Sequence, residues 1–308
     1  METTTLRQLA AYSAVARAAS FTAAAAEMHV SQSSLSRAVA DLERLLGVQL
    51  LERDTRNVQL TAAGVEALRI AEQIVTSHRA GMKELRRFLQ GESGTVAVAT
   101  LPSVAAVLLP QVISDFRERR PEVSVRLLDG LERLVLDRVL SGDADFAITT
   151  VGDPPEQLEH RPLVRDRFVA VLPESHPLAD RQEVAWDDLA RQPFLAVGRD
   201  SSVRRLTDAA FAQIDAHAAP AAEAGSIATV GGLVTAGLGV SALPALVLPL
   251  MGAGPIVFRP LVDPVVDRRL DIALRARRTL PAVTMRFLET LEEFRVRGSA
   301  LPPGVSWA

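Results

Sequence analysis

The pattern of hydrophobic and polar positions is most informative between residues 20 and 60. Residues 21–28 have the alanine-rich composition of a short helix, residues 29–31 interrupt it, and a second helix is predicted from about Gln32 to Leu46, closed by Gly47. At about 100° per residue, one stripe of the second helix is apolar, which indicates that it faces a core. This apolar stripe contains Leu35, Val39, Leu42 and Leu46.

The opposite stripe of this second helix is small, polar and basic. It contains Ser33, Arg37, Ala40 and Arg44, with Ser36 beside them. Small residues allow a helix to approach the DNA major groove closely, and Gln, Ser and Arg side chains reach base edges and phosphates. The alternative is a helical hairpin whose polar face is only solvated. If the helix binds DNA, the candidate contacts are Ser31, Gln32, Ser33, Ser34, Ser36 and Arg37.

The residues after this helix favour the DNA-binding interpretation. Residues 50–60 are predicted to form two short strands around a polar, basic tip, as in a wing beside a reading helix. Arg53 and Arg56 would then enter the adjacent minor groove. Thr22, at the start of the alanine-rich helix, is a candidate phosphate contact through its hydroxyl and the free backbone N–H groups there. A role in capping that helix is compatible with this contact.

These residues together resemble the LysR-type transcriptional regulators, which implies a winged helix-turn-helix. The resemblance is carried by Ser20, Phe21, Thr22, Ala25, Val30, Ser31, Gln32, Leu35, Ser36, Arg37, Leu42, Glu43, Leu46, Gly47, Leu50, Glu52, Arg53, Arg56, Leu60, Thr61 and Gly64. The chain departs from the family pattern at Leu51, where phenylalanine is more frequent, and at Ser33 and Ser34, where a proline is frequent.

Two further helices are predicted in the first ninety residues. A helix over about residues 5–18 braces the two described above, and Thr61 is the expected N-cap of a long helix reaching residue 89. The apolar stripe of the long helix contains Val65, Leu68, Ala71, Ile74, Val75, Met82, Leu85 and Leu89. This face could fold back on its own chain, but pairing with the same helix of a second subunit is favoured. The resemblance also implies dimers, often assembled into tetramers.

The pattern changes after residues 91–94, which are predicted to form a flexible joint. Short strands alternate with helices from there on, which indicates βα winding and a largely parallel sheet with crossover helices. The last ten residues are rich in Pro and Gly and are expected to be loose. Residues 176–179 and 237–244 also resemble the effector domain of LysR-type regulators. This likeness implies two α/β subdomains of periplasmic-binding-protein type, between which the chain crosses twice.

The predicted fold class is therefore α and α/β, with three parts. These are a winged helix-turn-helix over residues 1–60, a linker and dimerisation helix over 61–90, and an effector-binding domain over 91–308. Subdomain I is expected over about residues 94–163 and 268–298, and subdomain II over about 164–267. A small molecule would occupy the cleft outside the C-terminal ends of the strands.

Candidate effector-binding residues follow from that geometry, since they stand at strand ends and helix starts. They are Thr100, Leu101, Pro102, Ser103, Thr149, Thr150, Ser201, Ser202, Arg204, Ser226 and Thr229. Helix N-termini favour anions, and Arg204 could pair with a carboxylate, so the expected effector is a small organic anion. The competing interpretation is that the Ser and Thr residues only cap helices and that Arg204 lies on a solvated face.

Composition narrows the class of protein. The chain has no cysteine, which excludes disulfides, cysteine-based zinc sites and thiol redox sensing. Its net charge of −3 divides into +2 for residues 1–90 (eleven Lys and Arg, nine Asp and Glu) and −5 for the remainder (23 and 28). The small basic excess lies in the N-terminal ninety residues, which include the proposed DNA-binding domain. Residues 1–10 lack a signal pattern and the longest apolar run is too short to span a bilayer, so a cytoplasmic protein without a membrane partner is expected.

Two other functions are less consistent with the sequence. The first is an enzyme. The five histidines, at positions 29, 78, 160, 176 and 217, have no metal-ligand spacing, and the common nucleophile and phosphate-binding motifs are absent. No catalytic residue, metal or cofactor is therefore expected. The second is a free solute-binding protein, which would explain the C-terminal half of the chain but not the N-terminal winged helix-turn-helix. The prediction is a transcriptional regulator whose partners are double-stranded operator DNA, a small-molecule effector, a second copy or a tetramer of itself, and RNA polymerase.

Overall fold

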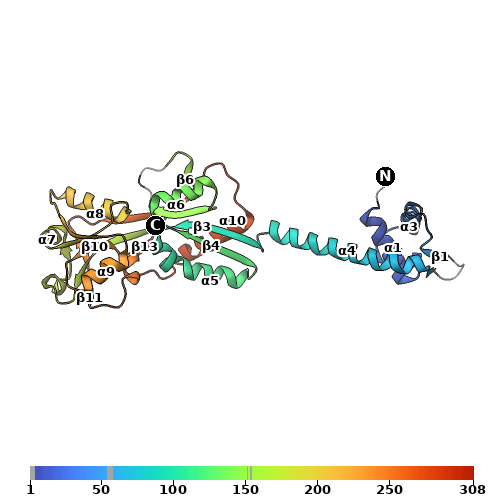
Figure 1. Ribbon diagram of the computed structural model, residues 1–308, viewed down its shortest axis with the longest axis horizontal. Coiled ribbons are helices and arrows are strands. Elements are labelled where there is room, and N and C mark those ends of the chain that lie inside the picture. The colour runs from blue at the N-terminus through green and yellow to red at the C-terminus, as the bar shows by residue number, and fades with distance from the viewer. Residues whose placement is uncertain (1–3, 54–57, 151, 153–154) are drawn as a thin grey trace. The chain divides into compact units, whose positions relative to one another are not determined.

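The computed structural model describes residues 4–53, 58–150, 152 and 155–308, and the chain divides into two compact units, 1–87 and 88–308. The first unit begins with α1 (Leu6–Ala18), α2 (Phe21–Glu27) and α3 (Gln32–Leu46) (Figure 1). Strands β1 (Leu51–Arg53) and β2 (Val58–Leu60) follow as an antiparallel pair in which Leu51 lies opposite Leu60. The predicted winged helix-turn-helix is thereby confirmed.

Local capping sets the boundaries of these helices. Thr5 forms a capping box with Gln8, the Ser20 hydroxyl accepts a hydrogen bond from the Ala23 N–H, and the Ser31 hydroxyl accepts one from the Ser34 N–H. Gly47 ends α3 in the left-handed region, at φ +66°, where a residue without a side chain is favoured. Because Ser20 caps α2, Thr22 is not the cap, and its hydroxyl is left exposed.

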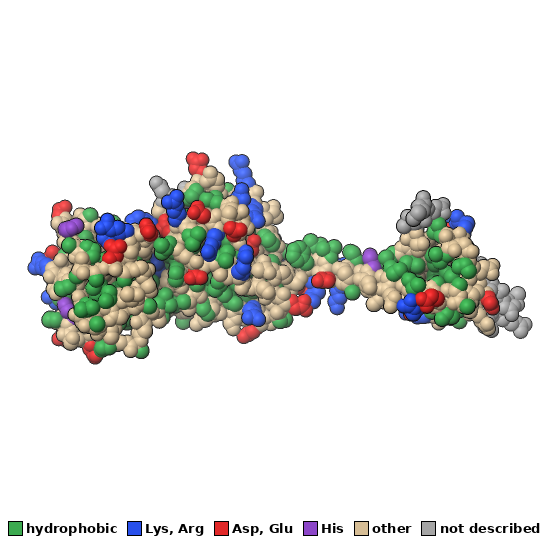
Figure 2. Space-filling model, viewed as in Figure 1, with side chains coloured by type: hydrophobic (Ala, Val, Ile, Leu, Met, Phe, Trp, Pro, Cys, Tyr) green, Lys and Arg blue, Asp and Glu red, His purple; other side chains and the backbone are tan. Residues whose placement is uncertain are grey.

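The long helix α4 (Ala62–Leu89) starts in direct contact with the winged helix-turn-helix of residues 1–60, which we call the head. The Thr61 hydroxyl accepts a hydrogen bond from the Gly64 N–H at 2.9 Å, as expected for its N-cap, and donates one to the Gln49 carbonyl at 2.8 Å. Ala71 and Val75 are buried, but most of the later apolar side chains are not. The large exposed ones on α4 are Val65, Ile70, Ile74, Met82, Leu85, Phe88 and Leu89. Figure 2 shows hydrophobic side chains on the surface of the long helix. None of the helices in the described ranges is long and apolar enough to cross a membrane.

The second unit contains a nine-stranded sheet whose main path runs β4-β3-β5-β12-β6-β11-β7. Its first part is parallel, with β3 (Gly94–Thr100) between β4 (Val123–Asp129) and β5 (Phe146–Thr150). The π-helical segment η1 (Val104–Leu108), α5 (Leu109–Arg119), α6 (Glu132–Ser141) and α10 (Ala282–Val296) pack on these strands. We call this half the first lobe. Its main core includes Val98, Phe116, Ile148 and Phe287.

The other half, the second lobe, has its own core. Trp186, Phe211, Val230 and Leu243 are among its buried residues. Its strands are β7 (Val184–Ala185), β8 (Phe194–Val197), β9 (Pro220–Ala224), β10 (Ser241–Pro244) and β11 (Ile256–Val262). Its helices are η2 (Pro177–Asp180), α7 (Trp186–Ala190), α8 (Ser202–Gln213), α9 (Ile227–Thr235) and η3 (Ala245–Leu250).

Two long strands connect the lobes. β6 (Leu158–Pro173) contributes Leu163 and Val164 to the first core and Phe168 to the second, and β12 (Asp267–Arg275) returns the chain to the first core through Leu270. The two strands pair antiparallel, with Asp267 opposite Arg167. The fold therefore has the two α/β lobes and the double crossing that the resemblance implied.

Two expectations about the second unit were wrong. The sheet is mixed and not largely parallel: β3 pairs parallel with β4 and β5, and β11 with β7, but every strand that pairs with β6 runs antiparallel to it, as β12 does to β5. The C-terminal residues are not loose, since β13 (Val305–Trp307) pairs with β6 and the Trp307 indole N–H donates to the Ser299 carbonyl at 3.0 Å.

Candidate functional site

The first candidate surface is the outer face of α3. Leu35, Val39 and Leu42 are buried in the head core, so the opposite face of the helix is fixed toward solvent. Of the predicted contacts, Ser31, Gln32, Ser33 and Arg37 are exposed, and Ser34 and Ser36 are half-buried. The arrangement matches a reading helix held from behind by a three-helix core.

Some of these side chains are already hydrogen-bonded within the chain, and others are free to contact DNA. The Ser31 hydroxyl caps α3 and lies 3.2 Å from the Ser33 hydroxyl, and the Ser34 hydroxyl accepts a bond from Arg7 at 3.4 Å. Within the described ranges, the Arg37 guanidinium has no hydrogen-bond or ion-pair partner, and this distinguishes it from Arg44, which pairs with Asp41. A free, exposed guanidinium on a small and polar helix face can donate two parallel hydrogen bonds to a base edge or a phosphate.

The wing is attached to α3 by a residue that the sequence did not mark as structural. The Glu43 carboxylate accepts hydrogen bonds from the Leu50 N–H at 2.8 Å and the Leu51 N–H at 3.1 Å. This contact fixes where β1 begins relative to α3. Arg53 is the last residue of β1, whereas Arg56 lies outside the described residues.

The second candidate site is a cavity of about 480 Å³ between the two lobes of the second unit. The first lobe contributes residues 101–103 and 131–132, the second contributes residues 201–203 and 225–228 with Val197, Val247 and Leu250, and Arg268 comes from β12. Most of this lining is apolar. The polar groups are hydroxyls at the starts of helices, one carboxylate and one guanidinium. Such a mixture suits a small ligand with an apolar body and few polar groups.

Six of the eleven predicted effector residues line this cavity. They are Leu101, Pro102, Ser103, Ser201, Ser202 and Ser226. Thr100, Thr149, Thr150, Arg204 and Thr229 do not. Thr100 and Thr149 are buried within the sheet, where the Thr100 hydroxyl donates to the Ile148 carbonyl, and the Thr150 hydroxyl donates to Glu132. Thr229 lies on α9 and is exposed.

Arg204 differs from its expected role as the partner of an effector carboxylate. Its guanidinium binds two carboxylates of the chain itself, those of Asp208 at 2.8 Å and Glu223 at 2.9 Å. These bonds neutralise the charge of Arg204, and the residue does not belong to the lining of the cavity. The sequence placed an arginine at a helix start correctly but did not show which way its side chain points.

The cavity instead contains Arg268, which sequence reasoning missed. Arg268 forms a buried ion pair with Asp166 of β6, with 2.5 Å between its Nη2 and a carboxylate oxygen, and the same Nη2 donates to the Ser103 hydroxyl at 3.2 Å. The other Asp166 oxygen accepts a bond from the Leu246 N–H at 2.9 Å. Burial raises the pKa of Asp166, while the adjacent Arg268 guanidinium opposes that rise. The available signal was its position at residue 268, where the sequence predicted that the chain returns to subdomain I.

A second ion pair lies at the edge of the cavity. Glu132, at the start of α6 in the first lobe, binds Arg205 of α8 in the second lobe at 2.8 Å and accepts a bond from the Thr150 hydroxyl at 2.5 Å. The carboxylate in the cavity lining therefore already has a cationic partner. It also joins the two lobes directly.

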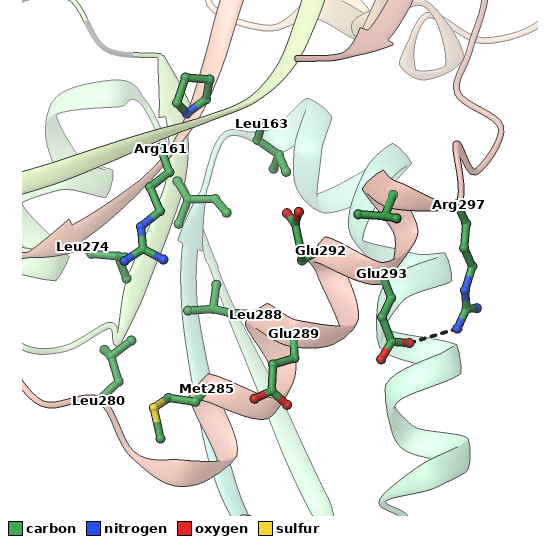
Figure 3. A pocket seen from close by; sticks show the side chains of 13 residues that line it. Arg161, Leu163, Leu274, Leu280, Met285, Leu288, Glu289, Glu292, Glu293 and Arg297 are labelled. Carbon is green, nitrogen blue, oxygen red and sulfur yellow. Dashed lines mark hydrogen bonds and ion pairs between the residues drawn. The ribbon is translucent and has the colours of Figure 1, made fainter.

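A larger groove of about 750 Å³ lies elsewhere on the first lobe, between α10, β6 and β12 (Figure 3). Its base is apolar, with Leu163, Leu274 and Leu288, and its rim carries Arg161 and the acidic side chains of α10. Glu293 of that rim pairs with Arg297 at 2.9 Å. The smaller cavity is the better candidate for a ligand site, because helix starts from both lobes converge there on a buried arginine.

Two family models match this chain. Residues 6–65 match the family described as bacterial regulatory helix-turn-helix protein, lysR family, and residues 89–295 match the LysR substrate binding domain. The chain is 32% identical over 299 residues to the uncharacterized HTH-type transcriptional regulator YfeR of Shigella flexneri, which covers 97% of this chain and 96% of that protein. It is 31% identical to the Hca operon transcriptional activator HcaR of Escherichia coli (strain K12), over 90% of this chain and 94% of that one.

Solved structures show the same likeness. CbnR, a LysR family transcriptional regulator, has 25% sequence identity and a TM-score of 0.77, covering 94% of this chain and 100% of that chain. HinK, a LysR family transcriptional regulator from Pseudomonas aeruginosa, has 26% identity and a TM-score of 0.61, covering 94% and 98% of the two chains.

Proposed function

Because the chain belongs to the LysR family of helix-turn-helix transcriptional regulators, we propose that it binds operator DNA through α3 and that a small molecule in the interlobe cavity alters this binding. The observation that carries the proposal is the outer face of α3, which is polar and basic while its inner face is buried. Arg37 is its central residue, since it is exposed and has no partner in the described part of the chain.

Each predicted DNA contact has a place in this proposal. Gln32, Ser33 and Arg37 are exposed on the first turns of α3, the end that enters a major groove. Thr22, Ser31, Ser34 and Ser36 are short hydroxyl side chains at or near helix starts, where phosphate oxygens are bound. Arg53 and Arg56 of the wing would contact the adjacent minor groove.

The exposed apolar side chains of α4 support a second copy of the chain as partner. A row of such residues on a helix that is otherwise solvated is stabilised when the same helix of another subunit covers it. A dimer, or a tetramer built from dimers, would present two reading heads to one operator. In this arrangement residues 1–60 read DNA, 61–90 pair the subunits, and 91–308 bind the effector.

The cavity accounts for regulation in this proposal. Helix starts and Arg268 favour a small organic anion, and its binding between the lobes would change their relative placement. The altered subunit arrangement then changes DNA bending and the access of RNA polymerase. These events take place in the cytoplasm, where DNA and polymerase are present.

A gel-shift assay with the DNA upstream of the chain's own gene tests the proposal. Replacement of Arg37 by alanine should weaken specific binding by about 1–3 kcal/mol, the usual cost of a lost bidentate base contact. Arg69→Ala is the matched control, since it removes the same charge from an exposed residue that is already paired with Glu66. Equal affinities of the wild type and the Arg37 variant would show that α3 is not the reading helix.

A further inference from the structure

The interlobe cavity contains a positive group whose surroundings are unusual. The Arg268 side chain is only 3% exposed, and Asp166, its ion-pair partner, is completely buried. Two of its nitrogens, Nε and Nη2, bind Asp166 or Ser103. The third nitrogen, Nη1, has no hydrogen-bond partner among the described residues, although Arg268 belongs to the lining of the cavity. The N–H groups of Nη1 are therefore available to an acceptor placed there, while Asp166 balances the charge of the guanidinium.

Other groups in the wall of the cavity would also favour an anion. The helices α8 and α9 both begin at it, at Ser201 and Ser226, so their free N–H groups and the positive ends of their dipoles lie at its wall. The Ser226 hydroxyl makes no capping bond of its own. The one acidic side chain in the lining, Glu132, is already bound by Arg205 and Thr150. The wall thus offers several donors to an anion and one carboxylate that is already neutralised.

The position of Arg268 connects the cavity with the strands that join the lobes. Asp166 lies on β6 between Val164, which belongs to the first core, and Phe168, which belongs to the second. Its second oxygen accepts the N–H of Leu246, a residue of η3 whose side chain is buried in the first core. Arg268 reaches Ser103 at the start of η1. A single buried network therefore links the wall of the cavity to the crossing strands and to both lobes.

From these contacts we propose that Arg268 determines the specificity of the effector site: its guanidinium binds the carboxylate of an effector with an apolar body while it stays paired with Asp166. This rests on the proposed function, because it assumes that an effector occupies the cavity. Ser103 and Ser226 supply further hydrogen bonds to the same carboxylate, and the leucine, isoleucine and valine side chains of the lining cover the apolar body. The Asp166–Arg268 pair then links the bound carboxylate to β6 and β12.

The test measures the thermal stability of the full chain with phenylacetate, hexanoate and cyclohexanecarboxylate, each compared with its own carboxamide. A ligand that binds only the folded protein raises its Tm in a concentration-dependent manner, from which a Kd follows. The wild type should be stabilised by one or more carboxylates and much less by the matched carboxamides. This comparison isolates the negative charge, since the two forms have nearly the same shape.

Two variants locate that preference. Arg268→Lys keeps the charge and its pairing with Asp166 but loses the planar fork, so carboxylate binding should weaken by about tenfold or more while the preference for the anion remains. The double variant Asp166→Asn, Arg268→Gln replaces the buried ion pair by a neutral amide pair and should lose the preference altogether. It also avoids leaving a buried carboxylate without a partner, which would destabilise the fold. Arg204→Gln is the matched control and should bind as the wild type does.

Several results would overturn the inference. Carboxamides that stabilise the wild type as well as the acids, unchanged binding in both Arg268 variants, or a loss in Arg204→Gln would each contradict it, as would a wild type that no carboxylate stabilises. If the double variant does not unfold cooperatively, the Kd ratio between wild type and Arg268→Lys decides alone. Operator binding by the same preparations is measured in parallel. A protein that binds its operator but fails the carboxylate test refutes only this inference, whereas one that binds no operator refutes the proposed function.

Discussion

The Arg205 guanidinium on α8 lies 2.8 Å from the carboxylate of Glu132 on α6, and this ion pair joins the two lobes at the edge of the cavity. The side chains are 50% and 20% exposed, respectively, so water and salt screen the pair in part. It therefore acts as a weak tie between the lobes. The buried Arg268–Asp166 pair is a stronger one, since removal of either partner leaves an unpaired charge without solvent.

The weak tie should be measurable in a double-mutant cycle. Glu132→Gln, Arg205→Gln and the combined variant should reveal a coupling of about 0.2–1 kcal/mol in the free energy of unfolding, as is usual for partly exposed pairs. Urea denaturation at low and high salt measures it, and the coupling should shrink at high salt. A coupling that is absent at low salt would show that the lobes are not joined here.

Gly64 should be indispensable to the head. A Cβ atom there would lie 2.1 Å from the Leu50 carbonyl oxygen, so Gly64→Ala must displace the start of α4 from the wing. We expect a loss of about 1–3 kcal/mol in stability, typical of overpacking, together with weaker operator binding. Gly81→Ala on the same helix is the control, because nothing lies within 4 Å of its Cβ. That variant should be stabilised by about 0.5–1 kcal/mol, the difference in helix propensity. Equal unfolding midpoints for the two variants would refute the assigned contact.

Tyr12 offers a spectroscopic test of how the head packs. It is the only tyrosine of the chain, its hydroxyl donates to the Gly64 carbonyl at 2.5 Å, and burial raises its pKa to about 12, with a smaller contribution from the charge of Glu43. Alkaline titration followed by phenolate absorbance should therefore show ionisation near pH 12 in the folded protein and near 10 in urea. Between these values the folded state holds the proton more tightly, so stability falls as the pH rises from 10 toward 12. A native titration at the unfolded value would place the phenol in water.

His160 should make stability depend on pH near neutrality. It lies on β6 opposite Ala273, and neither ring nitrogen has a partner in the described ranges. Burial lowers its pKa below the ordinary 6.5, Asp271 opposes this effect, and Arg269 reinforces it. Below pH 6.5 the unfolded chain binds the proton more readily than the folded one, so stability is lost as the pH falls.

The measurement compares urea midpoints of the wild type and His160→Leu at about pH 5.5 and about pH 7.5. The variant lacks the titrating group and should lose less stability on acidification. The difference between the two proteins isolates His160 from the carboxylates, which titrate in both. Identical pH profiles would contradict the assignment.

The head could be predicted from the sequence because its determinants are local. The spacing of Leu35, Val39 and Leu42 defines the buried face of α3, and Ser31 and Gly47 mark its two ends within a few residues of the chain. The same kind of signal predicted Ser103, Ser201 and Ser226 at the cavity, since each stands where a helix begins. The position of such a hydroxyl can be predicted locally, because it depends only on the directions of one strand and of the helix that follows it.

The rest required contacts between distant parts of the chain. The antiparallel pairing around β6 and the addition of β13 to it are choices of partner, and the composition of each strand is compatible with several partners. That Arg268 lines the cavity, and not the predicted Arg204, also depends on contacts between distant parts of the chain. Arg204 finds its carboxylates on its own helix and on a neighbouring strand, whereas Asp166 and Arg268 are 102 positions apart in sequence. The sequence by itself determined a DNA-reading head and hydroxyl groups at helix starts. The tertiary structure alone decided which arginine lines the interlobe cavity, because a buried ion pair forms only where two crossing strands meet without water between them.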